Sequence, residues 1–471
     1  MTAPHPDRLL GTEPQQTAVA RDLYESVKDL PIISPHGHVP VEWFATEYHF
    51  KNPTELFITP DHYVTRVMHA HGVPLSELGV NQKEFTDEQA RHAFELFGEY
   101  WWAYAGTPMR YWFEDSLANV FGITEDFGPD TAGRIYDEID EKLSSPEFST
   151  RALVERFNIE AISTTDDPVD DLRLHDQVIA DSAFGPVLAP AFRPDVYLEP
   201  GVEGWRDRAV ALGESAGVDA SDYEGFTEAM RRRRLYFKEH GAVLSDHSHM
   251  TVESERLDDA EADRLYAEAF AGRIVETDAA RLRAHLFNDQ AQLAREDGLI
   301  MTVHPAVYRS YDRRGLEEYG RDIGGDIPAR AEFSRGLRPI LNEMGSDPNF
   351  RLVAFTMDET TFSRSLAPLA GYYPSLYVGA PWWFLDQPEA ILRYYQAAVP
   401  NCGFGKLSGF IDDTRALCSI PSRHDMNRRV TARYVAGLVA DHRLSMEDGV
   451  DVMRRMIQTQ PRDVFRMVPK A

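Results

Sequence analysis

Two histidines stand one residue apart in the stretch LPIISPHGHVP, which covers residues 30–40. His36 and His38 follow an apolar run, and in a β-strand residues i and i+2 point to the same face. Two neutral imidazoles placed in this way can bind one divalent metal ion. The same residues could instead be polar turn residues, because a short motif of this kind is a weak signal by itself. The choice depends on which other side chains the fold brings next to them.

Short apolar, β-branched runs alternate with helical patterns along the chain, which is typical of a parallel α/β fold. Eight such runs can be counted, at residues 30–38, 159–168, 185–195, 241–249, 298–306, 350–360, 375–384 and 404–415. Eight β–α units predict a closed, TIM-type (β/α)₈ barrel. We expect one elaborated barrel domain over residues 1–471. A mainly helical insertion at 41–157 would cover the barrel mouth, and C-terminal helices at 422–471 would pack outside.

The expected strands end in polar, charged or aromatic residues, and active sites of such barrels gather at the carboxyl ends of the strands. The eighth strand of a closed barrel lies beside the first, so Asp413 is expected near His36 and His38. Two histidines and one carboxylate leave coordination positions open, as in catalytic metal sites. This ligand set predicts one divalent metal ion, for which Zn²⁺ suits best and Mn²⁺, Fe²⁺ or Co²⁺ are alternatives.

A second pair of histidines, His247 and His249, follows Asp246 in the fourth run. If Asp246 points into the barrel, strand alternation turns both histidines away from the interior. If they face inward instead, the metal would sit there. We favour the first pair as the metal ligands.

Charge and composition exclude several classes of partner. The chain has 49 Lys and Arg residues against 76 Asp and Glu residues, a net charge of −27, which repels nucleic acid and anionic membranes. The arginine run 231–234 lies in a helical pattern and is predicted to form a solvated helix face. Two isolated cysteines, no leader-like apolar segment and no run of membrane length predict a cytoplasmic protein. A homo-oligomer is compatible with the sequence.

Seven stretches, in this order along the chain, together resemble the uronate isomerases, the glucuronate/galacturonate isomerases of the amidohydrolase superfamily. They are ISPHGH, DHYVTRVMHAHGV, STTDDP, FRPD, SDH, PWWFLDQPE and DDTRALCSIPSRHDMNRRV, and the resemblance runs from about residue 20 to 460. It implies a distorted (β/α)₈ barrel, one divalent metal and a small anionic sugar, a uronate, as the substrate. The implied reaction is the reversible conversion of D-glucuronate to D-fructuronate, or of D-galacturonate to D-tagaturonate, through an enediolate.

The resemblance also implies roles for individual residues. The metal ligands would be His36, His38 and Asp413. The catalytic residues would be Asp413, Arg415, Tyr63 and His62, and the substrate would contact Arg193, Asp246, His304 and Trp382. An aldose–ketose isomerisation needs a base, a means of stabilising negative charge on oxygen and a proton relay, which these residue types can supply.

Two other functions remain open from the residues alone. A mononuclear hydrolase or deaminase of the same superfamily would also use two histidines on the first strand, His304 on the fifth and Asp413 on the eighth. Arg193 and Arg415 favour the isomerase, because an anionic sugar needs cations and a neutral nucleobase does not. A non-catalytic sugar-acid-binding barrel would keep the arginines without needing a base or a proton relay.

Overall fold

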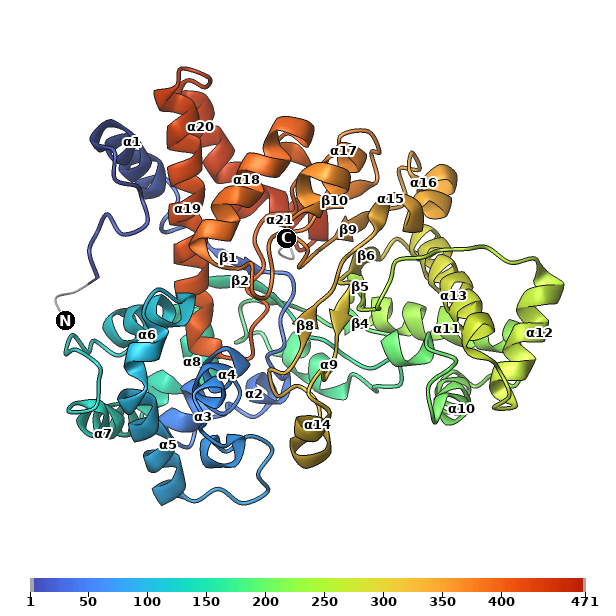
Figure 1. Cartoon of the computed structure of the whole chain (residues 1–471), viewed down its shortest axis with the longest axis horizontal. Helices are drawn as coiled ribbons and strands as arrows, with labels where there is room; N and C mark the ends of the chain where they lie inside the picture. Colours follow the sequence, from blue (N-terminus) through green and yellow to red (C-terminus); the bar gives the residue numbers. More distant parts are fainter. Residues whose placement is uncertain (1–3, 469–471) are drawn as a thin grey trace.

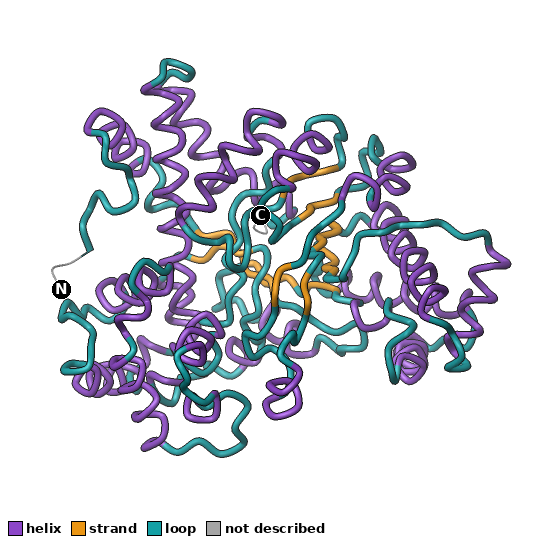
Figure 2. The backbone as a smooth tube through the Cα atoms, viewed as in Figure 1, coloured by secondary structure: helices purple, strands orange, loops and turns teal. Residues whose placement is uncertain are grey.

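The computed structural model describes residues 4–468, with short parallel strands at the centre and helices around them (Figures 1 and 2). The strands come from the apolar, β-branched runs, and most of their residues are buried, as expected when helices cover a parallel sheet. The barrel strands are β1 (Ile32–Ser34), β2 (Ile159–Ser163), β3 (Val187–Ala189), β4 (Ala191–Phe192), β5 (Leu244–His247), β6 (Ile300–Val303), β9 (Leu352–Ala354) and β10 (Leu376–Val378).

The strands follow one another around a closed ring. The pairing order is β1-β2-β3 in one sheet and β10-β9-β6-β5-β4 in the other, with every one of these pairs parallel. A parallel bridge between Asp166 and Phe192 joins the two sheets on one side. On the other side Val378 bridges Leu407, and the backbone N–H of His38 donates to the carbonyl of Thr414 at 3.1 Å. The predicted (β/α)₈ barrel is therefore confirmed.

Two of the eight expected strands differ from the prediction. The third, predicted at 185–195, is divided into β3 and β4 around Pro190, which has no N–H for a ladder hydrogen bond. The eighth, predicted at 404–415, forms only isolated pairings. Gly409 and Asp413 adopt positive φ angles of 85° and 44° there, which an extended strand cannot contain.

Between β1 and β2 the chain leaves the ring and builds a layer of helices at the lower left of Figure 1. Phe94, Phe97, Trp101, Phe113 and Phe127 pack edge to face in its core, with the last two ring centroids 4.7 Å apart. These helices are α2 (Glu42–Ala45), α3 (Pro53–Phe57), α4 (His62–Ala70), α5 (Asp87–Glu99), α6 (Pro108–Asn119), α7 (Ala132–Leu143) and α8 (Thr150–Arg156).

The remaining helices cover the outside of the ring. Those that follow β2 to β10 are α9 (Arg173–Ala180), α10 (Trp205–Ala216), α11 (Tyr223–Glu239), α12 (Asp259–Phe270), α13 (Glu276–Asp297), α14 (Arg313–Tyr319), α15 (Phe333–Gly336), α16 (Arg338–Met344), α17 (Ala367–Ala370) and α18 (Pro388–Cys402). The chain ends with α19 (Ile420–Ala440), α20 (Met446–Arg454) and α21 (Gln460–Phe465), and α1 (Pro14–Glu25) packs on α19. Among residues 4–468, every helix lacks the length or the apolarity needed to cross a membrane.

The arginine run on α11 does not form the solvated face that the sequence predicted. Arg232 is exposed, but Arg233 and Arg234 are buried. The Arg234 guanidinium pairs with the Asp297 carboxylate of α13, with Nε 2.6 Å from Oδ2. The reason is geometric. Successive helical residues are rotated by about 100°, so four in a row span most of the circumference and cannot share one face.

Candidate active site

The carboxyl ends of the barrel strands surround a cavity of about 640 Å³. Many of its lining residues come from the barrel strands or the segments directly after them, and His62 and Tyr63 begin α4, which brings the helical layer to the mouth of the ring. All ten residues that the sequence singled out contribute to the lining: His36, His38, His62, Tyr63, Arg193, Asp246, His304, Trp382, Asp413 and Arg415.

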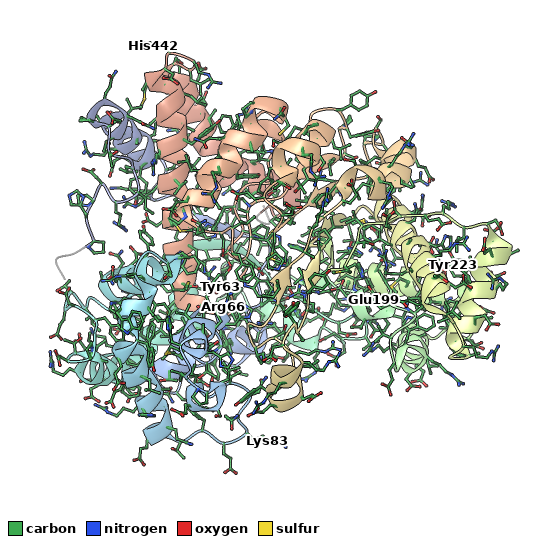
Figure 3. The ribbon with its side chains drawn as sticks, viewed as in Figure 1. Tyr63, Arg66, Lys83, Glu199, Tyr223 and His442 are labelled. Carbon is green, nitrogen blue, oxygen red and sulfur yellow. The ribbon has the colours of Figure 1, made fainter. Side chains whose placement is uncertain are left out.

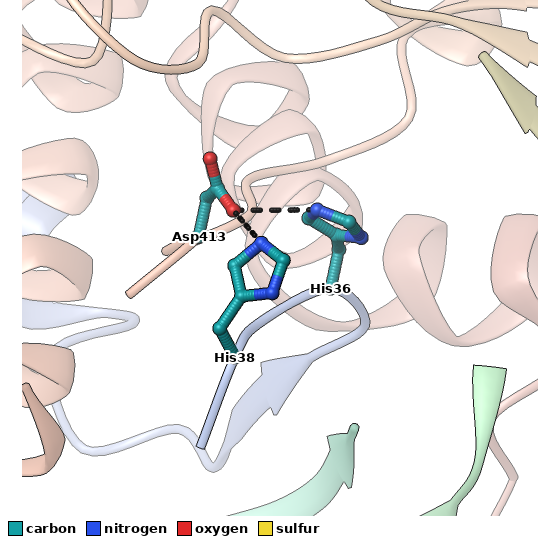
Figure 4. A group of neighbouring side chains, drawn as sticks. All are labelled: His36, His38 and Asp413. Atoms are coloured by element: carbon teal, nitrogen blue, oxygen red, sulfur yellow. Dashed lines mark ion pairs between the residues drawn. The ribbon is translucent and has the colours of Figure 1, made fainter. Parts of the chain in front are cut away.

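His36, His38 and Asp413 face one another at the base of this cavity (Figure 4). Oδ1 of Asp413 lies 3.3 Å from Nε2 of His36 and 3.2 Å from Nε2 of His38. That oxygen is buried, yet no hydrogen bond of acceptable geometry satisfies it. A buried carboxylate oxygen without a partner beside two imidazole nitrogens fits a divalent cation, whose bonds would satisfy all three atoms. Asp413 also has a positive φ of 44°, a strained backbone conformation typical of functional sites.

Two of the three residues have protonation states that suit metal binding. The exception is His36: burial alone would lower its pKa, but the charges of Asp246 and Asp413 raise it above its usual value. Burial lowers the pKa of His38 to about 4, although the neighbouring Asp413 acts in the opposite direction. Burial alone would raise the pKa of Asp413, but its contacts with His36 and His38 hold that pKa well below its usual value. The carboxylate is therefore ionised and His38 is neutral near pH 7, which are the forms that act as metal ligands.

A second cluster of polar and charged side chains surrounds Asp246, on the inner face of β5. One carboxylate oxygen lies 2.8 Å from Nδ1 of His304 and accepts a 2.6 Å hydrogen bond from the Thr302 hydroxyl. The other lies 3.5 Å from the guanidinium of Arg193. Burial would raise the pKa of Asp246, but His304, His36 and Arg193 together hold it well below its usual value. Asp246 and His304, with His36, could also surround a cation, and Oδ2 of Asp246 has no hydrogen-bond partner among residues 4–468. The Arg193 guanidinium beside this oxygen opposes a second positive charge there.

The second His-x-His pair points away from the cavity. The His247 ring faces the Thr302 carbonyl, with Nδ1 3.1 Å from that oxygen. His249 places Nδ1 2.7 Å from the Glu199 carboxylate, and both rings pack against Phe287. Neither histidine contributes to the lining, whereas Asp246 and Ser248 do. Strand alternation therefore separates this pair from the group around Asp413.

Aromatic rings also line the cavity. The His62 ring lies parallel to that of Trp383, with centroids 4.9 Å apart, and the Trp382 ring meets His304 edge-on at 4.7 Å. Burial, followed by the charge of Arg415, lowers the pKa of His62 to about 3, so its imidazole is neutral near pH 7. Both tryptophans line the cavity, although the sequence singled out only Trp382.

Further lining residues were missed in the sequence. Arg309 follows β7 (Val307–Tyr308), which pairs antiparallel with β8 (Ile327–Pro328) across a segment that contains α14. Arg309 donates to Asp326 at 2.8 Å and to Ser248 at 2.9 Å. Arg423, on α19, is almost completely buried and also reaches the cavity. Arg423 lies within a stretch that carried the resemblance, but nothing in its local pattern distinguished it from the other arginines there.

Comparison with known proteins gives one consistent result. A family model described as glucuronate isomerase matches residues 14–460. The uronate isomerase of Cutibacterium acnes is 50% identical over 98% of this chain and 97% of its own length. That of Corynebacterium efficiens is 44% identical, with 99% of both chains covered.

The fold agrees as closely as the sequence. The crystal structure of glucuronate isomerase from Caulobacter crescentus superposes with a TM-score of 0.96 at 38% identity, covering 99% of this chain and 98% of that one. The resemblance and the isomerase class predicted from the sequence are thereby confirmed. The chain belongs to the glucuronate isomerase family.

Proposed function

We propose that this protein converts an aldose uronate reversibly into its 2-keto isomer, D-glucuronate into D-fructuronate or D-galacturonate into D-tagaturonate. One observation carries the proposal: the group formed by His36, His38 and Asp413 shares a single cavity with Tyr63 and Arg193. A cavity of about 640 Å³ is within the usual range for small-molecule sites.

We propose that His36, His38 and Asp413 hold one divalent metal, with Zn²⁺ as the predicted ion because two imidazoles and a carboxylate suit it best. When bound, such an ion supplies positive charge that stabilises negative charge developing on a substrate oxygen. Only one oxygen of Asp413 faces the two histidines, and the other is directed away from both rings (Figure 4).

The reaction removes a proton from C2 and returns one to C1 through an enediolate. We assign Asp413 as the base, because its second oxygen is free of the two histidines. Arg415, two residues further on, can polarise the carbonyl. Arg193 supplies a partly buried guanidinium. Burial alone would lower its pKa, but the attraction to Asp195 and Asp246 raises that pKa, so the group stays charged.

His62 is assigned with Asp413, Arg415 and Tyr63 to the catalytic group, where it offers a neutral imidazole. Three further residues would bind and orient the sugar, and the Trp382 ring offers an apolar face against the carbon skeleton. Asp246 and His304, already joined to each other, can accept and donate hydrogen bonds to sugar hydroxyls. A hydrolytic reaction on a neutral base would have no use for the arginines beside the metal ligands.

The test is ¹H NMR of the purified protein with D-glucuronate, and separately with D-galacturonate, in D₂O. Appearance of the 2-keto sugar is the expected result, and the deuterium content at C1 distinguishes direct proton transfer from exchange with solvent. Asp413→Asn and Arg415→Met should abolish turnover while the fold is retained. Near-wild-type rates in either variant would contradict the assigned roles, and no ketose from either sugar with metal bound would refute the function.

The location and assembly remain predictions from the sequence, with a cytoplasmic protein expected and a homo-oligomer compatible with it. Fractionation of the producing cells and light scattering of the purified protein would test the two.

A further inference from the structure

Tyr63 is the second residue of α4, where its backbone N–H donates to the capping carboxylate of Asp61 at 2.9 Å. Its side chain is buried, and Tyr63 lies near the beginning of α19 (Figure 3), where the guanidinium carbon of Arg423 is 4.9 Å from the centroid of its ring. The phenolic oxygen lies 2.8 Å from both carboxylate oxygens of Asp386. Asp386 follows the Trp382-Trp383 segment and is only 2% exposed. Tyr63, which lines the cavity, is therefore hydrogen-bonded through its hydroxyl to Asp386, which does not line it.

Arg423 holds this carboxylate in place. Its guanidinium lies 2.8 Å from Oδ2 of Asp386 and also donates to the Asp412 carbonyl and the Ser419 hydroxyl. It stacks on the Trp112 ring, with the guanidinium carbon 3.6 Å from the ring centroid. Because a buried unpaired charge is costly, Arg423 both compensates the charge of Asp386 and restricts its orientation.

The direction of the phenolic proton follows from this arrangement. A tyrosine hydroxyl has one proton, and an ionised carboxylate can only accept. The Tyr63 proton therefore points towards Asp386, and the lone pairs of the oxygen remain able to accept a hydrogen bond. Towards a sugar, Tyr63 acts as an acceptor. Burial, followed by the charge of Asp386, raises the pKa of Tyr63 well above its usual value, so the phenol cannot hold the negative charge itself.

Asp386 is suited to take the proton that Tyr63 releases. Burial raises its pKa to about 6, although Arg423 and the Tyr63 hydroxyl act to lower it. The negative charge of Asp413 acts in the same direction as burial. A group with a pKa near the working pH can both accept and return a proton.

We propose that Asp386 is the inner end of a proton relay that runs from the substrate through Tyr63. The inference rests on the proposed uronate isomerisation. As a sugar hydroxyl loses its proton to the Tyr63 oxygen, the Tyr63 proton passes to Asp386. The sugar oxygen keeps the electron pair and becomes the carbonyl oxygen of the ketose. The reverse transfer delivers a proton to the neighbouring oxygen at C1, which leaves Asp386 and Tyr63 in their starting states.

The test uses the full-length, metal-loaded protein and the variants Asp386→Asn, Tyr63→Phe and their combination. We expect Asp386→Asn to lower kcat by about 100-fold or more, within the range for a lost acid–base group, with KM changed by less than about threefold. If Asp386 acts through Tyr63, the double variant should be no slower than the slower single variant. Asp289→Asn is the matched control. Asp289 accepts from the Tyr223 hydroxyl at 2.6 Å in a partly buried pair outside the cavity, so kcat should not change.

The inference would be overturned if the two substitutions lowered kcat multiplicatively in the double variant. A kcat of Asp386→Asn close to that of the wild type would also overturn it.

Wild-type protein provides a second test that does not depend on a variant folding. Its kcat should fall as pH decreases through about 6, because protonated Asp386 can no longer accept, with metal content measured at each pH. A constant kcat between pH 5 and 7 would also overturn it. Failure of wild-type protein to isomerise either uronate would refute the proposed function, whereas wild-type turnover with unaffected variants would refute the relay alone.

Discussion

Replacing Arg234 by methionine should destabilise the protein strongly, although Arg234 lies outside the cavity. Its guanidinium is completely buried and forms two hydrogen bonds with Asp297 and one with Gln290. Removal leaves the Asp297 carboxylate, 7% exposed, without its cation, which costs about 3–5 kcal/mol for a buried pair. With about 2 cal/mol/K of unfolding entropy per residue over 471 residues, that cost corresponds to a decrease in Tm of about 3–5 °C.

Differential scanning calorimetry at pH 7 measures this shift, and the same helix offers a control. Arg232 pairs with Glu228 one turn away, and its side chain is 51% exposed. An exposed pair contributes about 1 kcal/mol or less, so Arg232→Met should lower Tm by about 1 °C or less. Equal shifts in the two variants would refute the argument that burial distinguishes neighbouring arginines of this helix.

Three further predictions concern the site. The His36→Ala variant should lose its bound metal, whereas the His249→Ala variant should keep it, as measured by inductively coupled plasma mass spectrometry. The opposite result would place the metal at the second histidine pair. Arg193→Met should lower kcat/KM by about 100-fold or more through the loss of a partly buried cation of the cavity, and a change below about threefold would remove Arg193 from the mechanism. Burial raises the pKa of Asp166 to about 7, so the folded state retains a proton that the unfolded state has lost above pH 4. Asp166 therefore makes the free energy of unfolding fall as pH rises from 4 to 7. In Asp166→Asn, the decrease in Tm over this pH range should be smaller than in the wild type. The same pH dependence of Tm in both proteins would contradict this prediction.

The parts of the fold that depend on local pattern could be predicted from the sequence. The eight apolar runs have the length and composition of buried parallel strands, and seven of them contain strands in the structure. Positions where the backbone departs from regular geometry could not be predicted. Nothing in the pattern shows that Asp413 takes a positive φ and ends the regularity of the eighth run.

The same distinction applies to the site. The relation between His36 and His38 follows from strand periodicity, and the nearness of Asp413 follows from ring closure. The pairing of Tyr63 with Asp386 joins segments 323 residues apart through the path of two irregular connections. No periodicity encodes such a contact. The burial of Arg234, by contrast, could have been predicted, because four successive helical residues cannot all face solvent on a packed helix.

The closure of the barrel ring, where the eighth run lies beside β1, has a consequence for the order in which the site assembles during synthesis. His36 and His38 leave the ribosome long before Asp413 does. At translation rates of about 5–20 residues per second, roughly 20–75 s separate these events. During that time the nascent chain carries two histidines without their carboxylate partner, while the helices between β1 and β2 are already complete. The three-residue group therefore cannot assemble before the eighth run has been made, and a chain that stops before residue 413 has no means of forming it.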